Sequence, residues 1–418
     1  MSTEKRIEVG LVLQGGGALG AYEWGAVTAL LELLDELESS GRSVELKAVT
    51  GVSIGAINAA CVVGSADRAD ARRRLRAMWE DLRYDLAALL PRPLQPKASW
   101  WGLPGFFSLR TDWWNWLGWK YTYDSSPLLR TLADHVDFDA LNASPTACVV
   151  TAVDVESGQL TRFRNASGAL AAGAAKDARE SASAPTPGDT DHIDPRHVLA
   201  SGSLPPLLPW TGVGTDRVYW DGGLVDNTPL GEAIDAFSPD QDVERLLIVM
   251  NLFPLLAPRP TNRDQVEDRV SELKYGNRLL QDRKSAERIN ELVDLVGTLA
   301  GLVPKEKYPA ALRHRVDKAK RYKLVRLIPV NLHDAGVGSG TPAQDPLDGK
   351  DGHGDFSPLT VEHRFDVGHT LARRILTGEL LADRPAGQEA STWTANGEVV
   401  TPAGRPDDRS TGRATSAA

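Results

Sequence analysis

The first 65 residues repeat one pattern twice: a short apolar run, a turn that contains glycine, and a stretch compatible with a helix. The first copy runs from residues 7–13 through a glycine cluster into a segment whose apolar residues, from Val27 to Leu37, recur at helical spacing. The second copy begins with the apolar run at 44–50. Strands that alternate with helices are typical of a parallel sheet covered by helices. The sequence therefore predicts an α/β fold in three layers, with a mainly parallel central sheet between two layers of helices (αβα).

The composition excludes several classes of protein. The chain has 418 residues, and its 47 Lys and Arg against 56 Asp and Glu give a net charge of −9, which argues against nucleic-acid binding. Its two cysteines, Cys61 and Cys148, lie among apolar neighbours and favour buried thiols over disulfides or a zinc cluster. We find no signal peptide and no apolar stretch of ~18 residues. We expect a cytoplasmic protein with no metal or other cofactor, and peripheral membrane contact stays open.

Residues 51–55 form a G-x-S-x-G pentapeptide, GVSIG, between a predicted strand and a predicted helix. In that context the serine lies on a sharp strand-to-helix turn, and its hydroxyl is exposed above the edge of the sheet. Gly51 and Gly55 leave room for the turn, and the following helix points N–H groups toward developing negative charge. Ser53 is therefore the candidate nucleophile, and the alternative is a glycine-rich turn with an incidental serine.

A second glycine cluster, GGGALG at residues 15–20, follows the first predicted strand. Gly15, Gly17 and Gly20 fit the G-x-G-x-x-G fingerprint of dinucleotide-binding proteins. That fingerprint expects an acidic residue at the end of the second strand, but this strand ends in V-T-G. The other interpretation is an anion-binding loop whose free N–H groups form an oxyanion hole for Ser53. The two glycine loops would follow neighbouring parallel strands and share one site.

A serine nucleophile needs a base, and two residues compete for this role. Asp221 ends a short apolar run and precedes Gly222 and Gly223, which is a common presentation of a catalytic carboxylate. Its alternative interpretation is a β-turn aspartate. His353 is the best histidine for a conventional triad, but its loop, GKDGHGD, is more typical of a solvated residue. Asp221 is the stronger candidate.

The sequence resembles the patatin-like phospholipases, and more specifically bacterial members with a C-terminal extension. Four motifs in matching order carry the resemblance: GGGALG at 15–20, GVSIG at 51–55, ASGSLPP at 200–206 and DGG at 221–223. The resemblance covers about residues 7–255, and DFSP at 355–358 is loosely similar to a segment of the extension. Many members have Arg or Lys where this chain has Leu19.

This resemblance implies a patatin-like fold and a carboxylic ester hydrolase. The substrate implied is a phospholipid or a related lipid ester, cleaved through a Ser–Asp dyad and an acyl-enzyme intermediate. Ser53 is then the nucleophile and Asp221 the base. The oxyanion hole is implied at Gly15, Gly16 and Gly17. The remaining motif glycines support the loops: Gly20, Gly51, Gly55, Gly222 and Gly223.

Two other functions stay open at this point. The same dyad serves an acyltransferase or transacylase if an alcohol replaces water as the acyl acceptor. The glycine loop alone would serve a nucleotide-binding protein that is not a hydrolase. The sequence indicates neither the lipid nor the oligomeric state.

Composition divides the chain further. We expect a catalytic domain at 1–255, a C-terminal extension of helices and strands packed on it at 256–382, and a disordered tail at 383–418. Residues 166–192 are rich in Ala, Ser, Pro and Gly and predict a flexible insertion. The aromatic-rich segment 91–124 holds six of the eleven tryptophans. They form either a surface that meets lipid or a local core over the sheet.

Overall fold

The computed structural model describes most of the chain up to residue 254 and shorter stretches after it. The described residues are 6–91, 94, 99–170, 190–254 without 215, 239 and 241, parts of 257–302, 325–331, 353–380, 392–393 and 399–400. Most of the predicted insertion at 166–192 and of the predicted tail at 383–418 lies outside them.

The chain divides into two compact units, Met1–Ala382 and Asp383–Ala418. In the second unit, β12 (Thr392–Trp393) pairs antiparallel with β13 (Val399–Val400). The first unit contains both the elements before residue 255 and the elements of the predicted extension.

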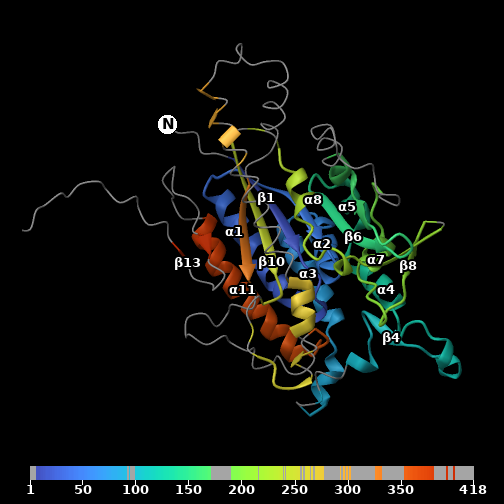
Figure 1. The fold of residues 1–418 in the computed structure, drawn as a ribbon. Coiled ribbons are helices and arrows are strands. Elements are labelled where there is room, and N and C mark those ends of the chain that lie inside the picture. Colours follow the sequence, from blue (N-terminus) through green and yellow to red (C-terminus); the bar gives the residue numbers. More distant parts are fainter. Residues whose placement is uncertain are drawn as a thin grey trace, which may run out of the picture. The chain divides into compact units, whose positions relative to one another are not determined.

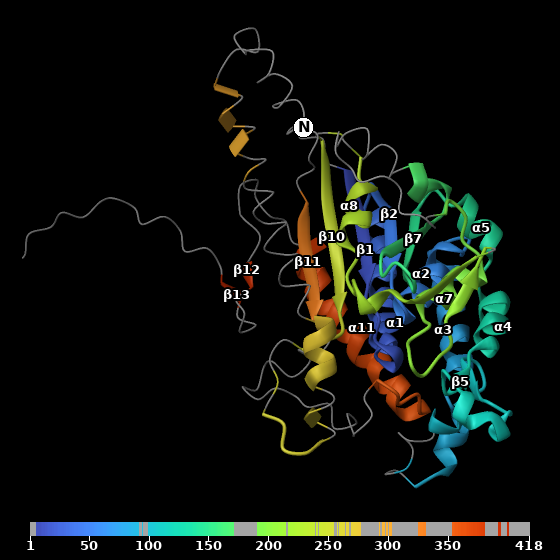
Figure 2. The ribbon, with the colours of Figure 1, turned by 45° about the vertical axis from the view of Figure 1, so that its right-hand side comes forward.

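The first unit is built on an eight-stranded sheet in the order β11-β10-β1-β2-β6-β9-β8, with β7 paired to β6 (Figures 1 and 2). The five strands from β11 to β6 are parallel, β7 and β9 run antiparallel to β6, and β8 runs antiparallel to β9. The mainly parallel sheet confirms the predicted fold class. The strands are β1 (Arg6–Leu13), β2 (Val44–Gly51), β6 (Ala147–Asp154), β7 (Leu160–Arg164), β8 (Thr211–Val213), β9 (Arg217–Asp221), β10 (Val243–Asn251) and β11 (Arg326–Asn331).

Helices cover both faces of this sheet. The α-helices are α1 (Gly20–Ser39), α2 (Ile54–Val63), α3 (Arg68–Leu82), α4 (Ser126–His135), α5 (Phe138–Ala143), α7 (Pro195–Ser201), α8 (Leu230–Asp235) and α11 (Pro358–Leu380). Side chains of α1, α2, α3 and α11 join one core with the sheet, and α8 packs in a second, smaller core. No described helix is long and apolar enough to cross a membrane.

Strand β1 illustrates why both faces need a cover. Leu11 and Leu13 are buried in the main core, while Val12 between them is buried in the core under α8. A strand that is apolar on both faces belongs at the centre of a sheet with helices on each side. The run of apolar residues at the start of the sequence therefore fixes β1 in the middle of the layers.

The predicted extension contributes to this same body. Strand β11 extends the sheet beyond β10, and α11 packs along α1. The two helices approach through glycines, because a Cβ on Gly25 would collide with the Phe365 carbonyl and a Cβ on Gly368 with the Tyr22 carbonyl. Such a close backbone approach joins the C-terminal helix firmly to the helix that follows the first glycine loop.

The aromatic-rich segment forms a small separate sheet with a short helix. Strands β3 (Gly102–Leu103), β4 (Phe107–Leu109) and β5 (Tyr123–Asp124) pair antiparallel, and the 3-10 helix η4 (Trp113–Gly118) lies between β4 and β5 in the chain. Phe106 belongs to the main core, but none of the residues of η4 is buried. The core interpretation therefore holds for Phe106, and the residues of η4 lie outside the core.

Candidate active site

The sheet brings the predicted motifs to one edge. Strands β1 and β2 are parallel with Leu13 opposite Gly51, so the two glycine loops leave the sheet side by side. The Val52 N–H donates to the Leu13 carbonyl over 3.2 Å. Strand β9 runs the other way and ends with Asp221 opposite Ala152, near the carboxyl end of β6. Residues that are far apart in sequence thus meet at the carboxyl edge of the parallel strands.

Ser53 lies at a strained turn between β2 and α2. Its φ of 54° and ψ of −123° make it the only non-glycine residue with positive φ in the described part of the chain. Such strain persists only where the surroundings hold it, and it is typical of functional sites. Glycine is required beside it, because a Cβ on Gly55 would lie 2.5 Å from the Leu13 carbonyl oxygen. This turn has the strand-to-helix geometry of a nucleophile elbow.

Two buried serines at the end of α7 support both halves of the site. The hydroxyl of Ser201 accepts a hydrogen bond of 2.9 Å from the Ser53 backbone N–H. The carbonyl of Ser203 accepts one of 3.0 Å from the Asp221 backbone N–H. The same short segment therefore fixes the backbone of the candidate nucleophile and of the candidate base.

Asp221 is buried, and its carboxyl interacts with the Ser53 side chain. Burial raises the pKa of Asp221 to about 6, although hydrogen bonds from Ser53 and Gly223 and the charge of Lys274 act to lower it. The Gly223 N–H donates to Asp221 Oδ1 over 2.8 Å. A carboxylate with a raised pKa that contacts a serine is a stronger base than a solvated aspartate.

The loop at Gly15–Gly17 is held by a side chain from the segment after DGG. The Gly15 N–H donates to Asn227 Oδ1 over 3.0 Å, and Asn227 Nδ2 donates back to the Gly15 carbonyl over 3.2 Å. The Gly15 N–H is thus already engaged. Within the described residues, no acceptor is bonded to the N–H groups of Gly16 or Gly17.

A buried polar cluster anchors the base of this loop. The Gln14 N–H donates to Glu23 Oε1 over 2.7 Å, and the Gln14 amide bonds to Thr228 and to the Leu252 N–H. Asn58 Nδ2 donates to the second oxygen of Glu23 over 3.1 Å. Burial raises the pKa of Glu23 well above its usual value. The loop therefore starts from a fixed peptide.

His353 does not lie on a solvated loop, contrary to the sequence interpretation. It is half-buried, its ring stacks on Phe253 at 5.5 Å, and its carbonyl accepts a hydrogen bond of 2.9 Å from the Ala18 N–H. Burial and the charge of Arg364 lower the pKa of His353 to about 4. Its contacts are with Phe253 and the first glycine loop, and the local sequence GKDGHGD contains no signal of these distant partners.

The sequence interpretation assigned no role to Ser201 and Asn227, which hold the two loops. Ser201 lies in the ASGSLPP motif, and Asn227 follows DGG by four positions. Their only signal in the sequence is this proximity to motifs, since a backbone-binding side chain has no pattern of its own.

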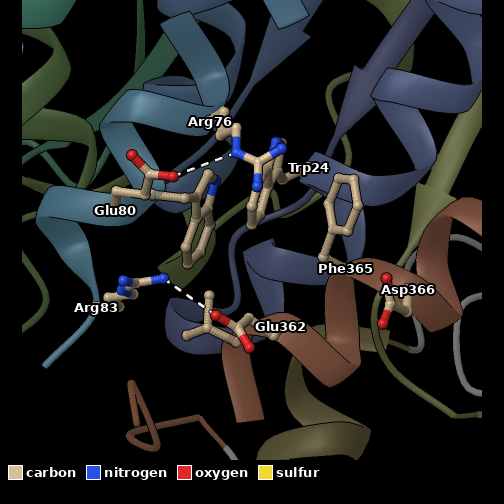
Figure 3. Close-up of a pocket in the computed structure, with 9 residues that line it drawn as sticks. Trp24, Arg76, Glu80, Arg83, Glu362, Phe365 and Asp366 are labelled. Atoms are coloured by element: carbon tan, nitrogen blue, oxygen red, sulfur yellow. Dashed lines mark hydrogen bonds and ion pairs between the residues drawn. The ribbon is translucent and has the colours of Figure 1, made fainter. Parts of the chain in front are cut away.

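A surface pocket lies elsewhere, between α1, α3 and α11 (Figure 3). Trp24 and Phe365 line it, and ion pairs of Arg76 with Glu80 and of Arg83 with Glu362 lie at its wall. Its lining includes neither Ser53 nor Asp221. Among the described residues, no group of three or more His, Cys, Asp or Glu is arranged to hold a metal ion.

The comparison with protein families agrees with the motifs. The family model of patatin-like phospholipases matches residues 11–234. No curated protein matches the sequence. Among solved structures, VipD from Legionella pneumophila matches with 14% identity over 87% of this chain and 67% of that chain, at a TM-score of 0.31. The family match covers more than half of the chain and includes both Ser53 and Asp221, and the chain therefore belongs to the patatin-like phospholipase family of lipid acyl hydrolases.

Proposed function

We propose that this protein hydrolyses acyl esters of phospholipids or related lipids with a Ser53–Asp221 dyad. One observation carries the proposal: a serine in a strained strand-to-helix turn contacts a buried carboxyl whose pKa is about 6. A carboxyl of this kind is ionised at neutral pH and still basic enough to take a proton.

In the first step, Ser53 Oγ attacks the carbonyl carbon of the ester and Asp221 accepts the hydroxyl proton. The negative charge of the tetrahedral intermediate then needs donors close to its oxygen. The loop Gly15–Gly17 supplies them in our proposal. Since the Gly15 N–H is bonded to Asn227, we assign the donation to the N–H groups of Gly16 and Gly17.

Collapse of this intermediate breaks the ester bond, and the leaving alcohol takes the proton from Asp221. The acyl group remains on Ser53. Asp221 then removes a proton from water, the water oxygen attacks the acyl carbon, and the fatty acid is released. An alcohol in the position of that water would give a transacylase with the same residues.

Labelling with a fluorophosphonate tests the proposal directly. Ser53 Oγ would bond to phosphorus, fluoride would leave, and peptide mapping should find the label on Ser53. A nucleotide-binding protein without an activated serine would not label. Incubation with a lipid panel, with and without a long-chain alcohol, separates hydrolysis from acyl transfer by the products: free fatty acid in the first case and a new ester in the second.

Gly16→Val should lower kcat for ester hydrolysis by about 10²–10³-fold, the usual cost of losing one oxyanion donor. The backbone of Gly16 is extended, with φ of 179°, so the effect is steric. A Cβ there would lie 2.8 Å from Leu252 Cδ1, and the larger valine must displace either the loop or the buried Leu252 side chain. Gly231→Val on α8 is the matched control, since nothing lies within 4 Å of a Cβ at that position. A folded Gly16→Val enzyme with normal kcat would assign this loop another role.

We further propose that helix η4 contacts the lipid surface. Its side chains Trp113, Trp114, Trp116 and Leu117 are 73%, 70%, 66% and 84% exposed. Tryptophan favours the headgroup boundary of a bilayer, where its ring is partly apolar and its N–H reaches water. The chain carries a net charge of −9, so apolar insertion rather than attraction to anionic lipid would drive the contact. A cytoplasmic location with peripheral membrane contact is part of this proposal.

Replacing Trp113, Trp114 and Trp116 by Ala should weaken binding to neutral phosphatidylcholine vesicles by about 100-fold or more, from the apolar area withheld from water. Cleavage of a short, soluble ester should be unchanged. Sedimentation with vesicles measures the binding. The affinity of the wild-type protein for neutral vesicles should not depend on the salt concentration. Leu89→Ala, at an 81% exposed residue outside η4, is the control. Equal losses on vesicles and on the soluble ester, with a lower melting temperature, would instead indicate a structural role for η4.

A further inference from the structure

We propose that His353 is a positioning residue that holds the Gly15–Gly17 loop in the shape that binds an oxyanion. This inference rests on the proposed function of that loop. His353 lies outside the family match at 11–234, so the active site would depend on a C-terminal segment that the shared motifs do not include.

Two hydrogen bonds join His353 to the loop. The Ala18 N–H donates to the His353 carbonyl over 2.9 Å. A second hydrogen bond links the His353 ring to the Gly16 backbone and acts to raise the pKa of the ring. A bond that raises the pKa of histidine stabilises its protonated form, so the ring N–H is the donor and the Gly16 carbonyl is the acceptor. His353 thus binds the loop with its backbone and with its side chain.

These bonds fix two successive peptide planes. The Gly16 carbonyl and the Gly17 N–H belong to one planar trans peptide and point in opposite directions. Holding the Gly16 carbonyl toward His353 therefore directs the Gly17 N–H away from it. The next peptide is held through the Ala18 N–H. The contact with His353 therefore sets the orientation of the Gly17 N–H, which is one of the two donors that we assign to the oxyanion. In this role His353 acts on the loop and not on the substrate.

The close approach of the two segments explains the glycine at position 17. A Cβ there would lie 2.5 Å from the His353 carbonyl oxygen, and the φ of Gly17 is +57°. Any side chain would both strain this backbone and push His353 off the loop.

His353 is itself held from two sides. The Ser99 hydroxyl donates to the Gly354 carbonyl over 2.6 Å, which links His353 and its neighbours to the aromatic-rich segment 91–124. On the other side, Asp355 bonds to the Ser357 N–H and to the Thr360 hydroxyl at the beginning of α11. Because α11 packs on α1, which follows the loop, the support and the supported loop belong to the same compact unit.

The pKa of about 4 keeps the ring neutral at the pH of an assay. The groups behind this value are the burial of the ring, the charge of Arg364 and the bond to Gly16. A neutral imidazole donates from one nitrogen only. The protonation state of the ring is therefore constant above about pH 5. An effect of replacing His353 on kcat at such a pH is then not caused by titration of the ring.

The test compares His353→Ala, His353→Asn and His353→Gln with wild type, and uses His369→Ala as the matched control. His369 lies on α11, is half-buried and bonds to Glu32 over 2.9 Å, so its replacement costs a similar contact away from the loop. For each protein we would measure kcat and KM on a short soluble ester, the rate of labelling by a fluorophosphonate, and the melting temperature.

We expect His353→Ala to lower kcat and the labelling rate by about 10- to 100-fold, as expected when donors are misplaced, with little change in KM. Either Asn or Gln should restore most of the rate, because its amide nitrogen takes the place of one ring nitrogen. Ser99→Ala, which releases the same segment from outside the site, should lower kcat in the same direction by a smaller factor.

Two outcomes would overturn the inference. One is a kcat of His353→Ala equal to that of His369→Ala. The other is a loss in His353→Ala that neither amide restores and that follows a fall in melting temperature, which would indicate a structural role only. Absence of labelling in the wild-type protein would instead overturn the proposed function, so the two failures are distinguishable.

Discussion

Ser53→Ala should abolish ester hydrolysis, with a fall in kcat on the order of 10⁶-fold, which is the loss typical when a serine nucleophile is removed. The reason is that the substitution removes the hydroxyl to which we assign formation of the acyl-enzyme. Labelling by a fluorophosphonate should disappear completely. The hydroxyl is small and contacts Asp221, so the fold should persist, as circular dichroism and the melting temperature would report.

Ser65→Ala is the matched control for this variant. Ser65 lies just beyond the other end of α2, and its hydroxyl bonds to the Cys61 carbonyl over 2.7 Å. The substitution removes the same atom from the surroundings of the same helix but leaves the turn at Ser53 intact. Hydrolysis and labelling should continue at wild-type rates. Activity of Ser53→Ala within a few-fold of wild type would refute the assignment of the nucleophile.

The fold and the two candidate reactive residues are recognisable in the sequence because their causes are local. The glycines at 51 and 55 are needed by the turn itself, and the apolar run of β1 follows from its place between two layers. Ser53 and Asp221 stand directly beside such local patterns. A reader of the sequence therefore finds them without knowing the tertiary structure.

The residues that support the site have no such pattern. Asn227 acts through an amide that bonds to the backbone of Gly15, and the sequence separates the two by more than two hundred positions. His353 acts through its own carbonyl and ring on a loop at the other end of the chain. Any asparagine or histidine could make such contacts, so only the three-dimensional arrangement identifies these two.

The aromatic segment illustrates a further limit of sequence patterns. Phe106 and Trp113 lie seven positions apart in one aromatic run, yet the first is buried against Phe356 and the second is 73% exposed. Composition alone does not distinguish the aromatic residues that are buried from those that are exposed. The short strands β3, β4 and β5 decide between them, because they turn one part of the run toward the core and leave η4 beyond it.

Asp221→Asn is the second large effect that we expect, with a fall in kcat on the order of 10⁶-fold, which is the loss typical when the base of a serine hydrolase is removed. Asparagine is nearly isosteric and its oxygen can still accept from the Gly223 N–H, so the geometry should persist. Its amide cannot accept the proton of Ser53. In a conventional triad, by contrast, a histidine would be the base. The aspartate would then only orient that histidine, and its replacement by asparagine would cost about 10⁴-fold. A fall of only that size in Asp221→Asn, together with one histidine variant as inactive as Ser53→Ala, would overturn the dyad and keep the serine hydrolase.

The pKa of Asp221 also predicts how the activity of the wild-type enzyme depends on pH. In the wild-type enzyme kcat/KM should fall about tenfold per pH unit below about pH 6, because only the ionised carboxylate accepts a proton.

The raised pKa also means that the folded state binds this proton more tightly than the unfolded chain, whose aspartate has a pKa of ~3.9. Stability from this group is therefore complete below about pH 4 and is lost as the pH rises through about 6, up to about 3 kcal/mol. Asparagine carries no charge to bury. Urea unfolding should therefore find Asp221→Asn more stable than wild type at pH 8 and by much less at pH 4, whereas an equal difference at both values would mean that Asp221 is not the buried base.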